Sequence, residues 1–280
     1  MIVDKNKKNP SKNTQWKKDE NQSFHVKHAS KKDDMLVCGM RPVIEAITSG
    51  KQVDKILLQN NLDSPLSKEL KSLARELSLP IQYVPQEKLN SLTTVNHQGV
   101  VALISPIVFH TFQDVLQQTV DAGRVPFFVM LDHVTDVRNF GAIVRTAECA
   151  GVDAIVVPDR GSAQIGADAI KCSSGALLRL PVCREPNFKT VINLALQSGF
   201  QVCAATEKGA TNYLEVDFRR PTLLLMGAED SGISPELLKL SDVRAKLPIL
   251  GDVQSLNVSV AAGIFMYEVL RQRSQTLAFS

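Results

Sequence analysis

An unbroken apolar run at residues 127–131 constrains the fold of this 280-residue chain more than any other feature. A strand that is apolar at every position, rather than at alternate ones, is typical of a parallel sheet covered by helices on both faces. The run leads into a polar segment and then a helical pattern, and the same succession recurs along the chain. We therefore expect an α/β fold.

Residues 126–280 are predicted to form the larger α/β domain. Hydrophobic patterning predicts strands at 127–131, 154–157, 177–181, 201–205, 222–226 and 244–247. It predicts helices at 142–150, 167–173, 188–197 and 235–240, and a last, almost wholly apolar helix after residue 259 that ends near residue 273. Ser255, Asn257 and Ser259 are small and polar, which suits the N-terminus of that last helix.

Residues 35–104 are predicted to form a smaller α/β unit. Its expected strands are 35–38, 53–59, 81–84 and 100–104, and its expected helices are 41–48 and 64–79. We expect His97, in the polar loop 94–99, to be a surface or RNA-contacting residue rather than a catalytic base.

Two further segments complete the chain. Residues 105–125 are predicted to be a linker with one helix at 112–120. Residues 1–33 are rich in Lys, Asn, Gln and Ser, and we expect a disordered basic tail that either touches phosphates or has no role.

Composition excludes several classes of protein. The net charge of +3 gives no argument for nucleic acid, and no apolar run is long enough to span a membrane. The five cysteines form no CxxC pair, so we expect reduced core thiols, no metal site and a cytoplasmic location.

Three predicted loops, 132–141, 227–233 and 248–257, follow strands and should meet at one edge of the sheet, where ligands bind in α/β proteins. No GxGxxG, Walker, GxSxG or HExxH motif is present. Glu229 in the glycine-bearing loop argues against a bound phosphate and favours a neutral or cationic ligand. S-adenosylmethionine, with its sulfonium and ammonium groups, would suit such a loop.

The three loops resemble the three motifs of the SpoU, or TrmH-like, family of RNA ribose 2′-O-methyltransferases. The matching segments are NFGAIVRTA at 139–147, LMGAEDSG at 225–232, and LP at 247–248 followed by SLNVSVA at 255–261. The smaller unit, including GMRPV at 39–43, resembles the substrate-binding domain of the family's ribosomal-RNA branch and a ribosomal-protein fold. The resemblance implies a C-terminal trefoil knot, a homodimer, S-adenosylmethionine as cofactor and no metal.

The resemblance also implies which residues form the site. Six residues are expected to hold S-adenosylmethionine: Met226, Gly227, Leu247, Ile249, Leu256 and Asn257. Five are expected to be catalytic: Asn139, Arg145, Glu229, Ser255 and Asn257. Arg145 should orient an RNA phosphate and stabilise the developing alkoxide, with the proton taken by Arg145 or by water. Asn139 should orient the hydroxyl or Arg145.

The expected substrate is a guanosine of large-subunit (23S) ribosomal RNA or its precursor. A tRNA ribose methyltransferase of the same family is one alternative. A non-catalytic RNA-binding or ribosome-assembly factor that kept the fold is another.

Overall fold

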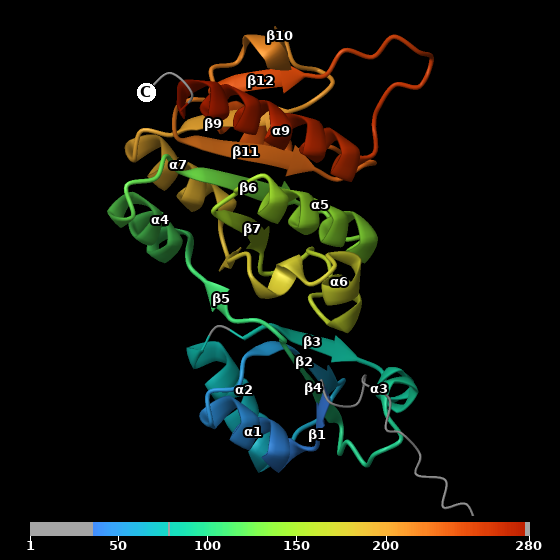
Figure 1. The fold of residues 1–280 in the computed structure, drawn as a ribbon. Helices are drawn as coiled ribbons and strands as arrows, with labels where there is room; N and C mark the ends of the chain where they lie inside the picture. The colour runs from blue at the N-terminus through green and yellow to red at the C-terminus, as the bar shows by residue number, and fades with distance from the viewer. Residues whose placement is uncertain (1–35, 78, 278–280) are drawn as a thin grey trace, which may run out of the picture.

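A computed structural model describes residues 36–77 and 79–277, which form two α/β units stacked end to end (Figure 1). The expected basic tail, residues 1–33, lies outside the described residues. The larger unit is built on an eight-stranded sheet in which every neighbouring pair is parallel. In spatial order the strands are β10 (Thr211–Asn212), β12 (Val243–Lys246), β9 (Gln201–Ala205), β11 (Thr222–Gly227), β6 (Phe127–Asp132), β7 (Ala154–Pro158), β8 (Val182–Glu185) and β5 (Phe109–His110).

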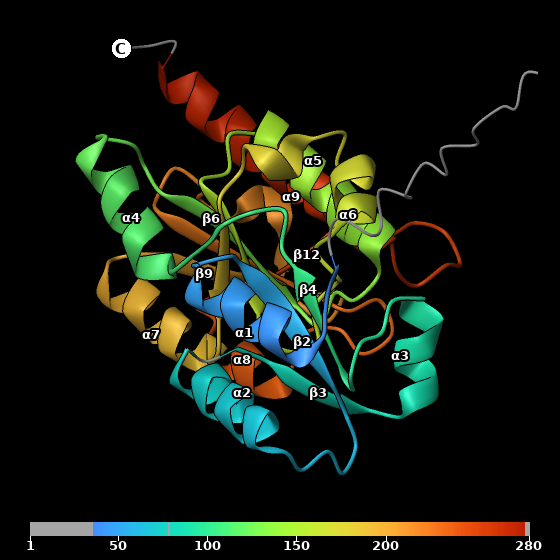
Figure 2. The ribbon, with the colours of Figure 1, turned by 90° about the horizontal axis from the view of Figure 1, so that it is seen from below.

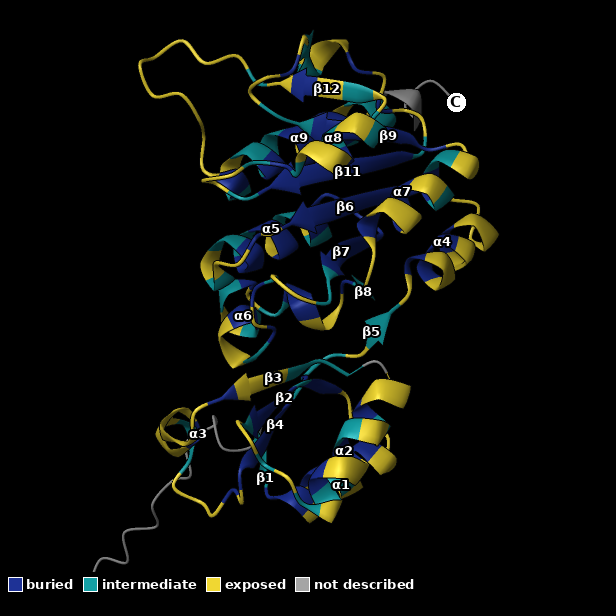
Figure 3. Cartoon of the chain, turned by 180° about the vertical axis from the view of Figure 1, so that it is seen from behind, coloured by how far each residue is buried: buried dark blue, intermediate teal, exposed yellow. Residues whose placement is uncertain are grey.

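Helices cover both faces of this sheet, as the apolar strands predicted (Figure 2). One face carries α5 (Val137–Cys149), α6 (Ala167–Cys172) and α9 (Val258–Leu277). The other carries α4 (Phe112–Asp121), α7 (Phe188–Gln197) and α8 (Pro235–Leu240). Alternate side chains of β6 enter the two cores: Phe127 and Leu131 pack with the first set, and Phe128 and Met130 with the second. Figure 3 shows the central strands as the most buried part of the molecule.

The smaller unit has a four-stranded sheet of order β1-β4-β2-β3. Its elements are β1 (Leu36–Cys38), α1 (Met40–Thr48), β2 (Val53–Gln59), α2 (Pro65–Glu76), β3 (Ile81–Val84), α3 (Gln86–Leu92) and β4 (Val100–Ile104). Helices α1 and α2 pack on one face, and Leu89 of α3 packs on the other. Helix α3 was not predicted, because it is short and follows Pro85.

The start of α5 corrects the sequence prediction. The helix begins at Val137 rather than at residue 142, because Asp136 caps it. Asp136 Oδ1 accepts the backbone N–H groups of Arg138 at 2.8 Å and Asn139 at 2.9 Å. The second half of the predicted loop, residues 137–141, is therefore helical, and Asn139 stands in the first turn of α5.

Three other expectations were wrong. Residues 177–181 form no strand; a 3-10 helix covers Ala176–Leu178, and β8 begins after Pro181. His97 is buried: its Nδ1 accepts the Gly99 N–H at 3.0 Å, and Nε2 lies 2.8 Å from Asn90 Oδ1. Cys149 is exposed rather than a core thiol, whereas burial raises the pKa of the Cys183 and Cys203 thiols to about 12.

An ion pair connects the two units. Arg184 of β8 donates to Asp54 of β2, with Nη2 2.5 Å from Oδ1, and its guanidinium lies 3.4 Å from the ring centroid of Phe109. Both members of the pair are largely buried, with exposed side-chain fractions of 12% and 10%. Segment 105–125 contains β5 as well as the expected helix, so it adds to the large sheet.

The C-terminal part of α9 is tied to the start of the central strands. Arg273 donates to the carbonyl oxygens of Val125 and Pro126, which precede β6, and to that of Arg220, which precedes β11. It also donates to the carbonyl of Phe218 at 3.0 Å. None of the helices in the described ranges is long and apolar enough to cross a membrane.

Candidate functional site

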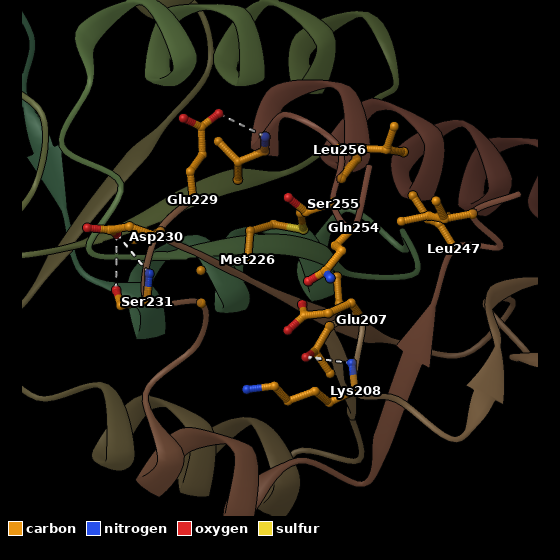
Figure 4. A pocket seen from close by; sticks show the side chains of 18 of the residues that line it. Glu207, Lys208, Met226, Glu229, Asp230, Ser231, Leu247, Gln254, Ser255 and Leu256 are labelled. Atoms are coloured by element: carbon orange, nitrogen blue, oxygen red, sulfur yellow. Dashed lines mark hydrogen bonds between the residues drawn. The ribbon is translucent and has the colours of Figure 1, made fainter. Parts of the chain in front are cut away.

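A cavity opens at the carboxyl ends of β9, β11 and β12, beneath the start of α9 (Figure 4). Its volume of about 270 Å³ is near the lower end of the range for small-molecule sites, which begins at about 300 Å³. Two of the three predicted loops, those after β11 and β12, line it.

Beside this cavity three side chains from the three predicted motifs meet. Asn257 donates from Nδ2 to Glu229 Oε1 at 2.6 Å and to Asn139 Oδ1 at 2.9 Å. Glu229 Oε1 also accepts the backbone N–H of Val258 at 3.3 Å. A carboxylate is stabilised there, because the first N–H groups of a helix lack internal partners and carry partial positive charge.

The position of Asn257 fixes the direction of its amide. Asn257 Oδ1 accepts the N–H of Ser259 at 2.8 Å and that of Val260 at 3.4 Å, as an N-capping residue does. Its Oδ1 therefore faces α9, and its Nδ2 is left to face Glu229 and Asn139. The predicted helix-start signal and the predicted site residue are the same side chain.

The loop after β11 turns back tightly and presents Glu229. The N–H of Gly232 donates to the carbonyl of Ala228 at 2.9 Å, and Gly232 has a φ of 67°, which favours glycine. A Cβ added to Gly227 would lie 2.2 Å from the carbonyl carbon of Gly232. Only glycine fits at position 227 without displacing this loop.

The cavity contains most of the residues predicted to hold a cofactor. Met226, Gly227, Leu247, Ile249 and Leu256 line it, and so does Ser255. Asn257 is the exception, because its side chain belongs to the adjoining cluster rather than to the cavity wall.

The loop after β9 also lines the cavity, and the sequence analysis missed it. Thr206, Glu207 and Lys208 belong to this loop. Figure 4 shows Glu207 and Lys208 beside the cavity. A polar stretch directly after a predicted strand was the signal that could have identified it. With Glu229 and Asp230, Glu207 gives the cavity three acidic side chains against one cation, Lys208. This balance favours a cationic ligand.

Arg145 is not part of the cluster. It lies six residues beyond Asn139 on α5, about 9 Å along the axis and about 120° around it. Its side chain is exposed. The three-residue cluster and the exposed arginine are therefore separate parts of the candidate site.

A second polar pair braces the same edge of the sheet. Asp132 Oδ1 lies 2.6 Å from His133 Nδ1, and its Oδ2 accepts the N–H of Ser234 at 2.7 Å. Asp132 is buried and lies opposite Gly227 in the register of β6 and β11. The pair thus fastens the glycine loop to the neighbouring strand. Across the two described ranges, no group of three His, Cys, Asp or Glu side chains is placed to hold a metal ion.

Comparisons with known proteins identify both units. Residues 126–267 match the model of the SpoU rRNA Methylase family, and residues 36–108 match that of the RNA 2′-O ribose methyltransferase substrate binding domain. A Staphylococcus haemolyticus protein assigned to the TrmH family of tRNA/rRNA methyltransferases is 35% identical over 243 residues, 87% of this chain and 98% of that protein.

Two solved structures are also similar. The SpoU methyltransferase AviRb from Streptomyces viridochromogenes, solved in complex with the cofactor AdoMet, is 27% identical with a TM-score of 0.55. The match covers 86% of this chain and 90% of AviRb. A TrmH/SpoU tRNA modifying enzyme from A. aeolicus is 30% identical with a TM-score of 0.51. That match covers 58% of this chain and 86% of the enzyme.

Proposed function

The chain belongs to the SpoU rRNA Methylase family of RNA methyltransferases, and we propose that it methylates a ribose 2′-hydroxyl in structured RNA. The proposed target is a guanosine of large-subunit (23S) ribosomal RNA or its precursor. The observation that carries the proposal is the meeting of Asn139, Glu229 and Asn257 beside a cavity that suits a cationic ligand.

We propose S-adenosylmethionine as the methyl donor. The AviRb structure, solved in complex with AdoMet, supports this choice, and so does the cavity of this chain. Met226, Leu247, Leu256 and Phe265 offer an apolar wall for an adenine, and the acidic side chains suit the ammonium and sulfonium groups. The bound cofactor would supply an electrophilic methyl group. The close return of the glycine loop at Gly227 brings the backbone of Gly232 against that of Gly227 at the cavity wall.

The side chains of this chain would act on the ribose. Glu229 holds Asn257, and Asn257 in turn holds the Asn139 carbonyl oxygen, so the amide of Asn139 is set in one orientation toward the ribose. Arg145 would bind the adjoining phosphate and stabilise the alkoxide that develops at the 2′-oxygen. The proton passes either to Arg145 or to water. Ser255 would shape the cofactor cavity at its rim.

The choice of ribosomal RNA is supported by the smaller unit. Residues 36–108 match a substrate-binding model, and the A. aeolicus tRNA enzyme matches only 58% of this chain. The same enzyme keeps tRNA as the second candidate substrate, because its identity to this chain is 30%. Deleting residues 35–104 discriminates between the two substrates. Methylation of tRNA that survives the deletion would favour tRNA as the substrate.

We further propose a trefoil knot at the C-terminus, a homodimer and a cytoplasmic location. Exposed apolar side chains on α9 and just before it support the dimer: Leu256, Val260 and Tyr267 are 42%, 51% and 51% exposed. Leu250, in the segment that projects between β12 and α9, is fully exposed (Figure 1). The size of the protein in solution tests the dimer.

The test of function is methyl transfer from labelled S-adenosylmethionine to RNA from cells that lack the protein, followed by mapping of 2′-O-methylated positions. One new mark in large-subunit ribosomal RNA, lost with Arg145→Ala, is expected. A new 2′-O-methyl group in tRNA would keep the proposed reaction and identify tRNA as the substrate. If naked RNA is not marked, the ribosomal precursor is tested. No transfer to either, with no cofactor binding by calorimetry, would favour a non-catalytic RNA-binding factor.

A further inference from the structure

A second cavity lies between the two units and shares no lining residue with the cofactor cavity. Its volume is about 420 Å³. One wall is formed by β3 with Asp54 and Lys55 of β2, and the other by the loop 159–164 that follows β7 with Arg184 of β8. Strand β3 is at the edge of its sheet, on the side that faces the large unit (Figure 1). We name this space the interdomain cleft.

The walls of the cleft carry side chains of the kinds that bind single nucleic-acid strands in other proteins. Tyr83 is 55% exposed, and Lys71 Nζ lies 5.9 Å from its ring centroid. Lys55 stands on the same side of the cleft, and the exposed Arg160 stands opposite. Cations that track phosphates and an aromatic ring on which a base stacks are the usual means of binding single strands.

The acidic residues of the cleft do not cancel these cations. Asp54 is paired with Arg184, so the two charges offset one another. Asp159 is half-buried, and this burial raises its pKa, although Arg184 and Arg160 act against the shift. Lys55, Arg160 and Arg184 stand against Asp54 and Asp159, so the lining of the cleft has a formal charge of +1 even with both carboxylates ionised, which suits a phosphate backbone.

The cleft is held open in advance and lies near the candidate active site. The Arg184–Asp54 pair joins the two walls, so a strand would enter a preformed space. Strand β7 is separated from β11 by β6 alone, which puts the start of the loop 159–164 about 10 Å from Gly227. That loop also packs on the brace of the site, because a Cβ at Gly161 would lie 3.1 Å from His133.

We propose that the interdomain cleft binds a single-stranded segment of the RNA next to the methylated nucleotide. Tyr83 stacks on one base, and Lys55 and Arg160 hold the adjoining phosphates. This subsite rests on the proposed function, since it places RNA beside the cofactor cavity. It assigns a positioning and specificity role to residues that lie outside all three motifs.

The test is the binding of a fluorescein-labelled oligouridylate of about twelve nucleotides, followed by anisotropy. Tyr83→Ala should weaken binding about tenfold, and Tyr83→Phe should keep it, because the ring and not the hydroxyl stacks. Replacing Lys55 and Arg160 together by Gln should lower the slope of log affinity against log salt by about 1.4, or about 0.7 for each lost phosphate contact. Lys239→Gln, an exposed change on α8, is the control.

Calorimetric titration with S-adenosylmethionine and thermal unfolding accompany each variant, and both should match the wild type. Three results would overturn the subsite. They are no binding of the oligonucleotide by the wild type, binding by Tyr83→Ala as tight as that of the wild type, and a loss of affinity in Tyr83→Phe as large as that in Tyr83→Ala. The free edge of β3 would then be a surface for another protein chain. A wild type that binds the oligonucleotide through Tyr83 but neither binds the cofactor nor transfers methyl groups would refute the proposed function and leave RNA binding in the cleft standing.

Discussion

Glu229 and Asn257 share a hydrogen bond of 2.6 Å, although 28 positions separate them in the chain. The same carboxylate oxygen accepts the N–H of Val258, the first residue of α9. The bond therefore joins the glycine loop after β11 to the start of the last helix. Through Asn257 it also reaches Asn139 on α5, so one carboxylate organises three segments.

Glu229→Gln should lower methyl transfer about a hundredfold, with cofactor affinity changed less than about tenfold. Glutamine keeps one oxygen that can accept from Asn257 and from the Val258 N–H, but it lacks the negative charge that strengthens both bonds and suits the helix N-terminus. Steady-state transfer assays and calorimetry measure the two effects. Glu236→Gln on α8, which removes an exposed carboxylate, is the matched control. Transfer at the wild-type rate in Glu229→Gln would refute the role of the cluster.

Gly227→Ala should destroy cofactor binding and destabilise the fold by about 1–3 kcal/mol, because its Cβ would overlap the backbone at Gly232. Calorimetry and urea unfolding report the two losses. Gly251→Ala is the control, since its Cβ would meet nothing within 4 Å. If Gly227→Ala kept wild-type affinity, the close return of the loop would not shape the cofactor cavity.

Arg145→Ala should lower the rate of methyl transfer about a hundredfold or more and leave the free energy of unfolding within about 0.5 kcal/mol. Its side chain is exposed, so the fold does not depend on it. Arg145→Lys should recover only part of the rate, because lysine lacks the planar fork that matches a phosphate. If Arg145→Ala instead lost stability along with the rate of methyl transfer, the result would indicate a structural role for Arg145.

Glu268→Gln should cost about 1 kcal/mol of stability at neutral pH and nothing at low pH. Hydrogen bonds from Arg271 and Gln272 hold the pKa of Glu268 below its ordinary value of 4.5. A carboxyl with a lowered folded pKa stabilises the protein above its unfolded pKa, and this contribution is lost as pH falls through the folded pKa. Urea unfolding from pH 7 to about pH 2.5 measures the difference in stability between variant and wild type, which should narrow once the pH falls below 4.5 and through the lowered folded pKa. If the difference in stability between Glu268→Gln and the wild type stayed constant over this pH range, the stabilisation would not come from the ionised form of Glu268.

Arg184→Gln should destabilise the protein by about 3 kcal/mol, because it leaves the Asp54 carboxylate buried without its cation. Proteolysis between the two units should become faster. Arg179→Gln, which breaks an exposed pair with Glu148, should change stability by less than about 1 kcal/mol. Asp54→Asn combined with Arg184→Gln should restore part of the loss. If the double variant recovers no stability, the loss of the Arg184–Asp54 pair is not the cause of the destabilisation.

Much of the fold could be predicted, because its strands are continuous apolar runs. Strand β6 and helix α7 lie where hydrophobic patterning predicted them. The start of α5 was misjudged because polar residues and Gly141 gave its first turn the composition of a loop. Gly141 is instead a close-packing position, since a Cβ there would lie 2.4 Å from Cys172 Cβ. Such a contact between two helices leaves no trace in local sequence.

The candidate site was likewise predicted in part and missed in part. The cavity residues Gly227, Leu247 and Leu256 followed from the motifs, whereas Glu207 in the loop after β9 was not considered. The bond between Asn257 and Asn139 spans 118 positions and depends on how α9 lies against α5. The chain reaches α9 from β12, and β12 lies next to β9 rather than next to β11. A single sequence does not reveal this strand order, so the position of α9 could not be predicted from it.

The bonds of Arg273 bear on when this protein becomes competent during its own synthesis. A nascent chain that ends before α9 has Asn139 and Glu229 but lacks Asn257, which joins them. It also lacks the cation that holds the carbonyl groups at the start of β6 and β11. Domains fold as their chains emerge from the N-terminus onward, so the small unit is complete long before this cluster. A growing polypeptide can therefore complete its smaller unit while the cluster of Asn139, Glu229 and Asn257 forms only after α9 has been made.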